Sequence, residues 1–486
     1  MKPATEKTAA NRPRGQEAYT RLRVDFWNAA AGFKGRFGGI RHAYHRRLAE
    51  VYSFLVPPGM RVLELGCASG DLLAALRPAH GVGVDFSPAM LAEAREKYPN
   101  LDFIQADVHD LDLDETFDYI ICADLVNDLW DVQRVFETIA RHSHPGTRVI
   151  LNTYSRLWEA PRAIAERMGI APRLPVQNWL TIEDLDNLLT LADFESIRSW
   201  REILCPARIP ALASFANRYL VKLWPFRSFA LTNFAIARPS PQRRGGPEPT
   251  VTVVVAARNE EGNIPAIFER IPEIGGGTEL LFVEGNSTDD TYGAIEREIS
   301  RHPSIRASLM KQPGRGKGDA VRTGFEHASG DVLMILDADL TVPPEDLPRF
   351  YEAWRSGRAE FVNGVRLVYP MEDRAMRFFN FLGNKFFSVA FSWLLSQTIK
   401  DTLCGTKVLS KRDYEVIAAN RAYFGDFDPF GDFDLIFGAA RFNMKIVDLP
   451  VRYRERTWGE TNIRRWSHGW LLLRMMVTAM RRIKFV

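Results

Sequence analysis

Long apolar segments and paired cysteines are both missing from this sequence. No run reaches the roughly 18 consecutive apolar residues that a membrane-spanning helix needs, so we expect no integral membrane segment. The four cysteines, Cys67, Cys122, Cys205 and Cys404, stand far apart and form no Cys-x-x-Cys pair. Their spacing argues against a structural zinc site and against a disulfide framework, and it favours a reducing cytosol.

An excess of charge of one sign is also lacking. The 63 Lys and Arg residues nearly balance the 60 Asp and Glu residues, and the net charge of +3 supplies no strong field for nucleic acid. We therefore expect no nucleic-acid partner. Residues 1–18 are polar and contain no apolar core segment, which favours a disordered tail over residues 1–19 and not a signal peptide.

The sequence does have enough apolar content for packed cores. It is 46% hydrophobic and 25% charged, as globular proteins are, and its 486 residues are too many for one ordinary domain. The Pro-, Gly- and Arg-rich segment 238–249 can continue neither a helix nor a strand. We predict a first domain over residues 20–238, a linker over 239–249, a second domain over 250–456 and a basic amphipathic helix over 457–486.

The first half begins with a pattern of strand, glycine turn and helix. Residues 61–73 contain the turn, in which Gly66 and Gly70 let the backbone approach a ligand closely. A second apolar strand ends in Asp85, about 20 residues further on, where a carboxylate accepts the two hydroxyls of a ribose. Two further strands end in Asp107 and Asp124. Acids and glycines at successive strand ends predict one ligand site along the carboxyl edge of a parallel sheet.

Over about residues 50–240 this succession resembles the class I S-adenosylmethionine-dependent methyltransferases. It departs from many members at Ala68, where they have a third glycine. The resemblance implies that S-adenosylmethionine is the cofactor and that the methyl group is transferred by in-line displacement at the sulfonium carbon. The cofactor-binding residues that it implies are Glu64, Gly66, Cys67, Gly70, Asp85, Asp107, Val108 and Asp124.

A base for this methyl transfer is not singled out by the sequence. An oxygen or nitrogen nucleophile that starts protonated needs one. The candidates are Asp124, Asp128, His109 and His142, although a residue of each of these types is more often an ordinary surface or loop residue. The first half therefore either transfers a methyl group, or binds only the cofactor or nothing and serves the transferase as a scaffold or regulator.

The second half has four strand-end and loop motifs in succession. They lie in residues 250–261, 279–290, 314–320 and 330–341. In the last of them, a buried strand ends in Asp337 and Asp339, whose side chains point the same way in extended chain. Two neighbouring carboxylates repel each other unless a cation lies between them, and Mg²⁺ or Mn²⁺ suits such a pair together with substrate phosphates.

The order and spacing of these motifs resemble the family 2 glycosyltransferases of the GT-A fold over about residues 250–455. One departure is Glu284, where many members have Asp. The resemblance implies a nucleotide-sugar donor whose diphosphate is bridged by a metal at Asp337 and Asp339. The donor-binding residues that it implies are Ala257, Asn259, Glu260, Glu284, Lys317 and Asp337. The predicted fold class is therefore α/β, with two Rossmann-like domains: a class I methyltransferase sheet, then a GT-A sheet with C-terminal amphipathic helices.

A narrower resemblance, to the polyprenyl-phosphate (dolichyl-phosphate) sugar synthases, rests on residues 363–366, 374–396 and 400–407. It implies that Arg366 binds a phosphate and that Asp401 is an acidic active-site residue. The segment Gly405-Thr406-Lys407 departs from the usual Gly-Phe-Arg or Gly-Phe-Lys. The rival acids for the catalytic role are Asp432 and Asp434.

Apolar residues recur at helical spacing over 375–394, and Trp and Arg alternate with apolar residues over 464–484. Basic residues with Trp on one helix suit a membrane interface, although packing of two helices in the core explains the pattern equally.

Our interpretation is a bifunctional enzyme of glycan or glycolipid assembly, peripheral on the cytoplasmic face of a membrane. The second domain would be an inverting, metal-dependent transferase that moves a sugar to a polyprenyl phosphate. The alternative is a transferase acting on a polysaccharide, with the first domain as a binding or scaffold module.

Overall fold

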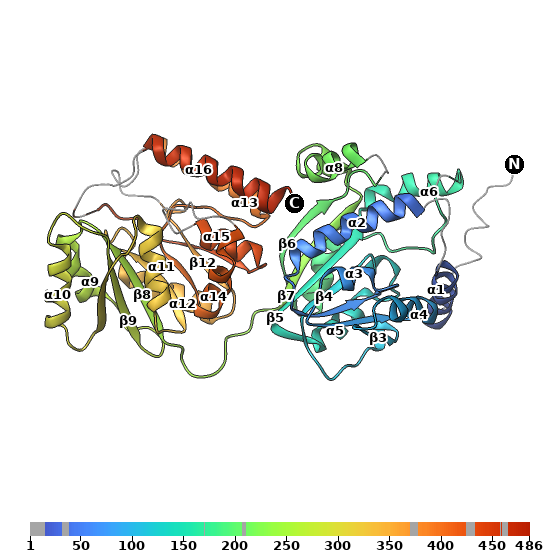
Figure 1. The fold of residues 1–486 in the computed structure, drawn as a ribbon, viewed down its shortest axis with the longest axis horizontal. Coiled ribbons are helices and arrows are strands. Elements are labelled where there is room, and N and C mark those ends of the chain that lie inside the picture. The colour runs from blue at the N-terminus through green and yellow to red at the C-terminus, as the bar shows by residue number, and fades with distance from the viewer. Residues whose placement is uncertain are drawn as a thin grey trace. The chain divides into compact units, whose positions relative to one another are not determined.

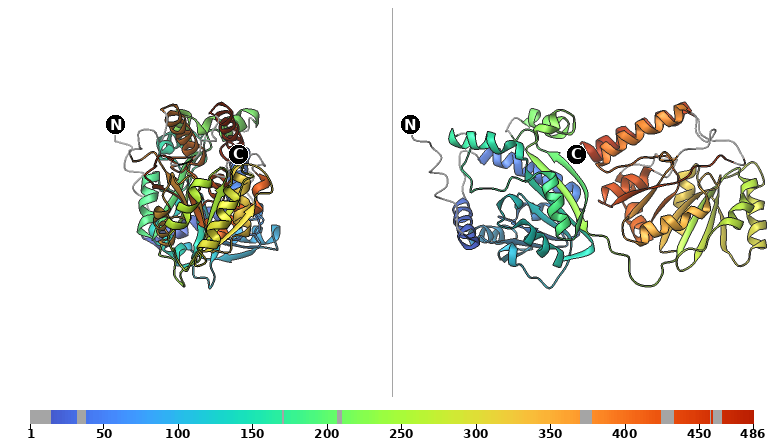
Figure 2. Two further views of the ribbon diagram at one scale, coloured as in Figure 1. Left: turned by 90° about the vertical axis from the view of Figure 1, so that its left-hand side faces the viewer. Right: turned by 180° about the vertical axis from the view of Figure 1, so that it is seen from behind.

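The computed structural model describes residues 15–31, 38–169, 171–206, 210–369, 378–423, 433–456, 458 and 465–486. The chain divides into two compact units, and it passes from unit 1 to unit 2 between Ser240 and Pro241. Each unit is a sheet flanked by helices (Figure 1), as the two further views also show (Figure 2). Residues 1–14 of the predicted tail and the predicted acid Asp432 lie outside the described residues, whereas residues 16–19 of that tail are helical.

Unit 1 is built on a seven-stranded sheet with the order β3-β2-β1-β4-β5-β7-β6. Only β7 runs antiparallel to its neighbours β5 and β6. The strands are β1 (Arg61–Leu65), β2 (His80–Asp85), β3 (Asp102–Gln105), β4 (Phe117–Ala123), β5 (Ser143–Tyr154), β6 (Phe194–Glu202) and β7 (Thr232–Pro239). The central strands are almost continuously buried, as expected for parallel strands covered on both faces.

The α-helices of unit 1 are α1 (Gln16–Ala30), α2 (Gly38–Leu55), α3 (Asp71–Ala75), α4 (Pro88–Lys97), α5 (Val132–Arg141), α6 (Glu159–Arg167), α7 (Ile182–Leu191) and α8 (Pro210–Arg218). Short 3₁₀ turns lie at η1 (Val108–Asp110), η2 (Val126–Asp128), η3 (Arg156–Trp158), η4 (Leu220–Lys222) and η5 (Phe226–Phe229). Local side chains fix several helix starts. The Ser87 hydroxyl accepts from the Met90 N–H at the start of α4, and Thr181 and Asp184 form a reciprocal capping box at the start of α7.

Unit 2 also has a seven-stranded sheet, with the order β10-β9-β8-β11-β13-β12-β14, in which β13 runs antiparallel to β11 and β12. Its strands are β8 (Val251–Ala257), β9 (Thr278–Glu284), β10 (Arg306–Lys311), β11 (Val332–Asp337), β12 (Phe361–Val365), β13 (Lys407–Ser410) and β14 (Ile446–Pro450). The prediction of two successive α/β domains is confirmed by the two sheets.

The α-helices of unit 2 are α9 (Ile264–Arg270), α10 (Thr291–Arg301), α11 (Lys317–His327), α12 (Leu347–Arg355), α13 (Phe378–Leu395), α14 (Lys411–Ala419), α15 (Phe433–Arg441) and α16 (Arg465–Ala479). Short 3₁₀ turns are η6 (Glu261–Asn263), η7 (Pro344–Asp346) and η8 (Arg421–Tyr423), and η9 (Met480–Lys484) is a π-helix that follows α16. None of the helices within the described ranges is long and apolar enough to cross a membrane.

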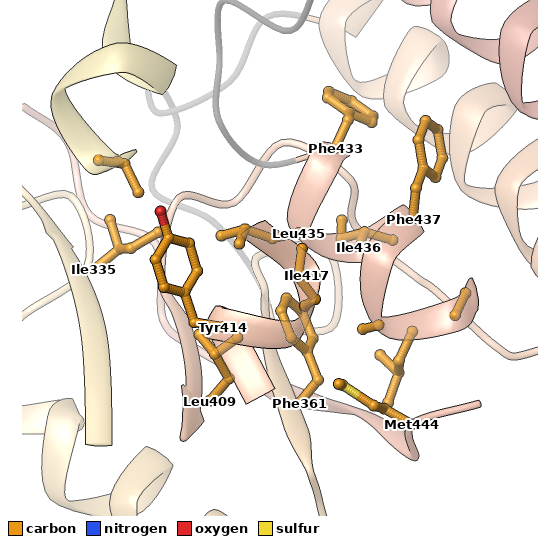
Figure 3. Close-up of a cluster of buried hydrophobic side chains, with 14 of the residues drawn as sticks. Ile335, Phe361, Leu409, Tyr414, Ile417, Phe433, Leu435, Ile436, Phe437 and Met444 are labelled. Atoms are coloured by element: carbon orange, nitrogen blue, oxygen red, sulfur yellow. The ribbon is translucent and has the colours of Figure 1, made fainter. Parts of the chain in front are cut away.

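The unit 2 sheet has a core on each face. Alternate residues of β8 separate accordingly, with Val253 and Val255 in one core and Val254 in the other. Figure 3 shows part of the second of these, where side chains from β11, β12 and β13 meet those of α14 and α15. Leu472 and Met475 of α16 are buried in the same core, so one face of this helix packs as the core alternative predicted.

Candidate functional site

Strand register brings the predicted donor residues of unit 2 to one edge of the sheet. Asp337, the last residue of β11, pairs with Ala256 of β8, and Ala257 pairs with Glu284 of β9. These strands are parallel, so their carboxyl ends lie side by side. The Gly285 N–H donates to the Ala257 carbonyl at 2.8 Å and ties the first two strand ends together.

The turns after β8 and β9 brace each other through the predicted residues. Asn259 has a φ of 58°, a left-handed conformation that Asn tolerates better than most residues. Its side-chain oxygen accepts from the Thr288 N–H at 2.8 Å. The buried Glu284 accepts from the Ser287 N–H at 2.5 Å. The two turns are thereby held rigid at the point where a nucleotide is expected to lie.

Lys317 and Asp337 form an ion pair at the centre of this edge. Lys317 is the first residue of α11, and its Nζ lies 2.5 Å from Asp337 Oδ1. Although burial raises the pKa of Asp337, the positive charges of Lys317, Arg366 and Lys407 outweigh it, so the pKa lies below its ordinary value. Gly405 packs directly against the pair, and a Cβ there would overlap both charged groups.

Asp339 has a different cation. Its Oδ2 accepts from Arg456 at 2.6 Å, and its Oδ1 accepts from the Thr341 hydroxyl at 2.8 Å. Arg456 also lies 3.6 Å from Glu260. Burial raises the pKa of Glu260 to about 7, although Arg456 and Asn263 oppose the shift. Arg456 was not among the sequence-predicted residues, because it lies 117 residues from Asp339 and no spacing in the sequence connects them.

The carboxylates fit a divalent cation that is shared with a diphosphate. Mg²⁺ is commonly held by one or two protein carboxylates while substrate phosphates and waters complete its oxygen shell. Asp337 and Asp339 supply two such carboxylates. Each is paired with a basic side chain, Lys317 or Arg456, which could bind a phosphate instead. Within the described part of the chain, no cluster of three or more His, Cys, Asp or Glu forms a metal site by protein groups alone.

Arg366 and Asp401 are brought together as a buried bidentate pair. Arg366 donates through Nε and NH2 to the two carboxylate oxygens, at 2.7 and 2.9 Å, and Asn384 donates to the same carboxylate at 2.9 Å. Asp401 is fully buried, which by itself raises its pKa, but the charge of Arg366 brings the pKa down to about 2. The carboxylate is therefore ionised and engaged.

Asp434 lies at the start of α15 among arginines. Its Oδ2 is 3.7 Å from Arg322 and 3.5 Å from Arg421. Arg322 and Arg421 also line a cleft with Asp319, Thr323 and Glu326. The catalytic roles of Arg366, Asp401, Asp432 and Asp434 stay predictions.

In unit 1, four of the predicted cofactor residues line one pocket: Gly66, Asp85, Asp107 and Val108. Its other lining residues are Tyr19, Thr20, Arg23, Phe86, His109, Leu125, Asp128, Leu129 and Trp130. The contribution of α1 was not predicted residue by residue, since nothing local in the sequence says which face of that helix turns towards the sheet.

Four predicted residues of unit 1 do not line this pocket: Glu64, Cys67, Gly70 and Asp124. Asp85 accepts from the Ala68 and Ser87 N–H groups at 2.9 and 2.8 Å, which binds the glycine turn to the second strand. Gly70 has a φ of 73°, and a Cβ there would overlap the Phe103 ring. Glu64 is buried beneath the turn, and burial raises its pKa to about 8. Cys67 is buried too.

All four candidate bases have structural partners. Asp124 accepts from Tyr44 at 2.7 Å and from Asn152, and burial raises its pKa to about 6. The other three are paired as follows: His109 with Asp107, Asp128 with Trp27 and Arg23, and His142 with the Leu111 carbonyl. Two of the four, His109 and Asp128, line the pocket, whereas Asp124 and His142 do not.

Two family models match the chain, one in each unit. Residues 40–199 match the model described as a methyltransferase domain, and residues 252–417 match the model described as glycosyl transferase family 2. The chain therefore carries a methyltransferase domain followed by a family 2 glycosyltransferase domain, and both predicted resemblances are confirmed.

Several curated relatives are sugar transferases. A dolichol-phosphate mannosyltransferase from Pyrococcus furiosus is 29% identical over 220 residues, which are 44% of this chain and 59% of that protein. An undecaprenyl-phosphate 4-deoxy-4-formamido-L-arabinose transferase from Klebsiella pneumoniae is 24% identical over 219 residues, which are 44% of this chain and 63% of that protein. The chain thus matches less than two thirds of the length of each of these relatives.

Solved structures similar to part of the chain are methyltransferases. Magnesium protoporphyrin IX methyltransferase from Synechocystis PCC 6803 is 17% identical with a TM-score of 0.34, covering 46% of this chain and 100% of that one. A methyltransferase from Mesorhizobium loti is 22% identical with a TM-score of 0.31, covering 39% and 97%. The methyltransferase domain of unit 1 is identified by the family model that matches residues 40–199.

Proposed function

We propose that unit 2 transfers a sugar from a nucleotide-sugar to a polyprenyl phosphate, and that unit 1 transfers a methyl group from S-adenosylmethionine. The observation that carries the proposal is the cluster of Lys317, Asp337, Asp339 and Arg456 at an edge where three parallel strands end. Two carboxylates and two cations at that edge suit a metal-bound diphosphate. The curated relatives whose names include a polyprenyl phosphate supply the acceptor class.

The two cations give the site a way to change partners when the donor enters. Lys317 and Arg456 neutralise the carboxylates in the free protein, and both side chains are long enough to turn towards phosphate oxygens. A divalent cation held by Asp337 and Asp339 would stabilise the negative charge of the departing diphosphate. An acceptor oxygen would attack the anomeric carbon from the opposite side, so that configuration inverts and the nucleoside diphosphate leaves with the bonding electrons.

A phosphate acceptor would require no general base from unit 2. A phosphate monoester carries about 1.5–2 negative charges near neutral pH, so it requires cations to hold it more than a base to activate it. Arg366 has five N–H donors, of which the bidentate pair with Asp401 uses two through its side chain. Asp401 thereby orients the guanidinium, whose remaining N–H donors would bind the phosphate.

A lipid acceptor also requires contact with a membrane, and two helices of unit 2 provide for it. On α13, the exposed residues Leu382, Phe386 and Val389 follow one another at helical spacing. On α16, Trp470 is 72% exposed although the opposite face of the helix is in the core. Peripheral attachment on the cytoplasmic face fits these exposed apolar residues.

In unit 1, Asp85 is proposed to hold the ribose of S-adenosylmethionine, and Asp107 is proposed to lie on the adenine side. The glycine turn at Gly66 would let the protein backbone approach the cofactor closely. The protein then has mainly to align the acceptor with the methyl group.

The test is a nucleotide-sugar panel offered with polyprenyl phosphate, with labelled S-adenosylmethionine present and products identified by mass spectrometry. A glycosylated polyprenyl phosphate is expected. Sugar transfer only to a polysaccharide would replace the lipid acceptor, and cofactor binding without methyl transfer to any acceptor would make unit 1 a scaffold.

A further inference from the structure

The connection between β6 and β7 in unit 1 has an unusual composition and an unusual orientation. From Ile203 to Leu231 it contains no Asp or Glu, while it contains four basic and five aromatic residues. We define the acid-free surface as its exposed apolar and basic residues: Leu212, Phe215, Arg218, Tyr219, Leu223, Trp224, Phe226, Arg227 and Phe229.

Helix α8 turns its larger apolar residues outwards. Leu212, Phe215 and Tyr219 are exposed and recur at spacings of three and four, so they share one face, and the rings of Phe215 and Tyr219 lie 5.6 Å apart. The buried residues of α8 are two small ones, Ala213 and Ala216, and the polar Asn217. A helix that served folding alone would be placed the other way round.

Polar anchors hold the segment in this orientation. The Asn217 side-chain oxygen accepts from the N–H groups of Leu204 and Cys205, both at 2.8 Å, and its amide donates to the Cys205 carbonyl at 2.7 Å. Lys222 is buried and paired with the buried Glu202 at the end of β6. Because a buried polar group is costly to leave unsatisfied, these bonds fix which face points inwards. The outward apolar face is thus specified by the structure and is not a packing accident.

Sheet register places this surface at the same edge as the proposed cofactor site. Thr232, which opens β7, pairs with Glu202 at the end of β6 and with Tyr154 at the end of β5. Since β5 is parallel to β4 and β4 to β1, the connection emerges beside the ends that carry Gly66 and Asp124. In Figure 1, α8 lies beyond the end of β6.

We propose that the acid-free surface docks unit 1 onto an anionic lipid bilayer. Exposed Trp, Tyr and Phe next to arginine suit the headgroup region, and the absence of acidic residues over the whole connection complements anionic lipid. Trp224, at 77% exposed, is its most prominent residue. A second copy of the same surface is a poorer partner, because Arg218 and Arg227 would meet their own like charges. Docking would bring a lipid-borne methyl acceptor to the sheet edge where the cofactor is proposed to bind. This consequence, unlike docking itself, rests on the proposed methyl transfer.

The test reads unit 1 separately from the helices of unit 2, in the full chain. Vesicles containing brominated phosphatidylglycerol are expected to quench tryptophan emission in the wild type. Trp224→Phe keeps an aromatic residue and should lower the quenched emission. Trp470→Phe reports on α16 in the same way. The proposal would be overturned if Trp470→Phe abolished the quenching and Trp224→Phe left it unchanged, because only unit 2 would then enter the bilayer.

Partitioning supplies a second readout. Arg218→Gln combined with Arg227→Gln should weaken binding to phosphatidylglycerol vesicles roughly thirtyfold, as loss of two basic residues at an anionic surface does. The control is Leu191→Ser, an exposed apolar residue of α7 just before β6, at the opposite edge of the sheet. Docking would be refuted if the control and the double variant weakened vesicle binding equally. It would also be refuted if the protein dimerised strongly and Trp224→Ser abolished the dimer without any effect on vesicle binding. Calorimetric binding of S-adenosylmethionine verifies that each variant is folded, and its absence in the wild type would bear on the proposed function alone.

Discussion

Replacing Gly405 by alanine should inactivate sugar transfer while leaving the protein stable. A Cβ at this position would overlap the Asp337 carboxylate and the Lys317 ammonium group. Ordinary contact between heavy atoms requires about 3.5–4 Å, so both charged groups must move by roughly 1 Å or more. A displacement of about 1 Å at a reacting site can cost 10²-fold in rate, which corresponds to about 2.7 kcal/mol in the barrier.

The stability cost is expected to be small for two reasons. The overlapping atoms are the far ends of flexible side chains, and Gly405 does not have the positive φ that would exclude alanine. Alanine also restricts the unfolded chain, which contributes about 0.4–1 kcal/mol in favour of folding. The net change in the free energy of unfolding should therefore stay within about 1 kcal/mol.

The assay is kcat/KM for sugar transfer, together with the urea midpoint of unfolding and methyl transfer in the same preparation. Gly245→Ala is the matched control, because no atom lies within 4 Å of its added Cβ. The variant Gly405→Ala should lose about 10²-fold in kcat/KM, whereas the control should lose nothing. A wild-type kcat/KM in Gly405→Ala would show that the Lys317–Asp337 pair does not serve the reaction.

Three further outcomes are expected. Asp339→Asn should reduce sugar transfer by about 10²-fold or more, and chelation should abolish it in the wild type until Mn²⁺ is restored; transfer at full rate in chelator would remove the metal from the mechanism. Asp85→Ala should weaken S-adenosylmethionine binding by about 1–3 kcal/mol in calorimetry without changing sugar transfer, and an unchanged affinity would dismiss its ribose role. Asp401→Ala should lower the free energy of unfolding by about 3–5 kcal/mol, because Arg366 is left buried without its partner. The pKa of Asp401 is lowered from 3.8 to about 2, so the stabilisation by its carboxylate is complete above about pH 4 and is lost as the pH falls towards 2. The urea midpoint of the wild type should fall over this pH range, whereas that of the variant should show no such fall.

The sequence by itself determined the two sheets and the strand ends that carry the candidate site residues. Strand, glycine turn and helix at 61–73, and the strand that ends in Asp337, are local patterns, and each is found where it was expected. Parallel strands align their carboxyl ends, so the local patterns were also sufficient to predict that Gly66, Asp85 and Asp107 approach one pocket.

Only the tertiary structure decided which charged groups face one another. The pairing of Asp339 with Arg456 and the bidentate pairing of Arg366 with Asp401 join residues far apart in the chain, and neither has a local signal. Likewise, the pattern of α8 would predict that Phe215 is buried, whereas Asn217 is the buried residue because it satisfies backbone groups near the end of β6. Periodicity sets the spacing of side chains along an element, but the face that turns inwards is selected by hydrogen bonds and ion pairs with distant parts of the chain, which the sequence of the element does not contain.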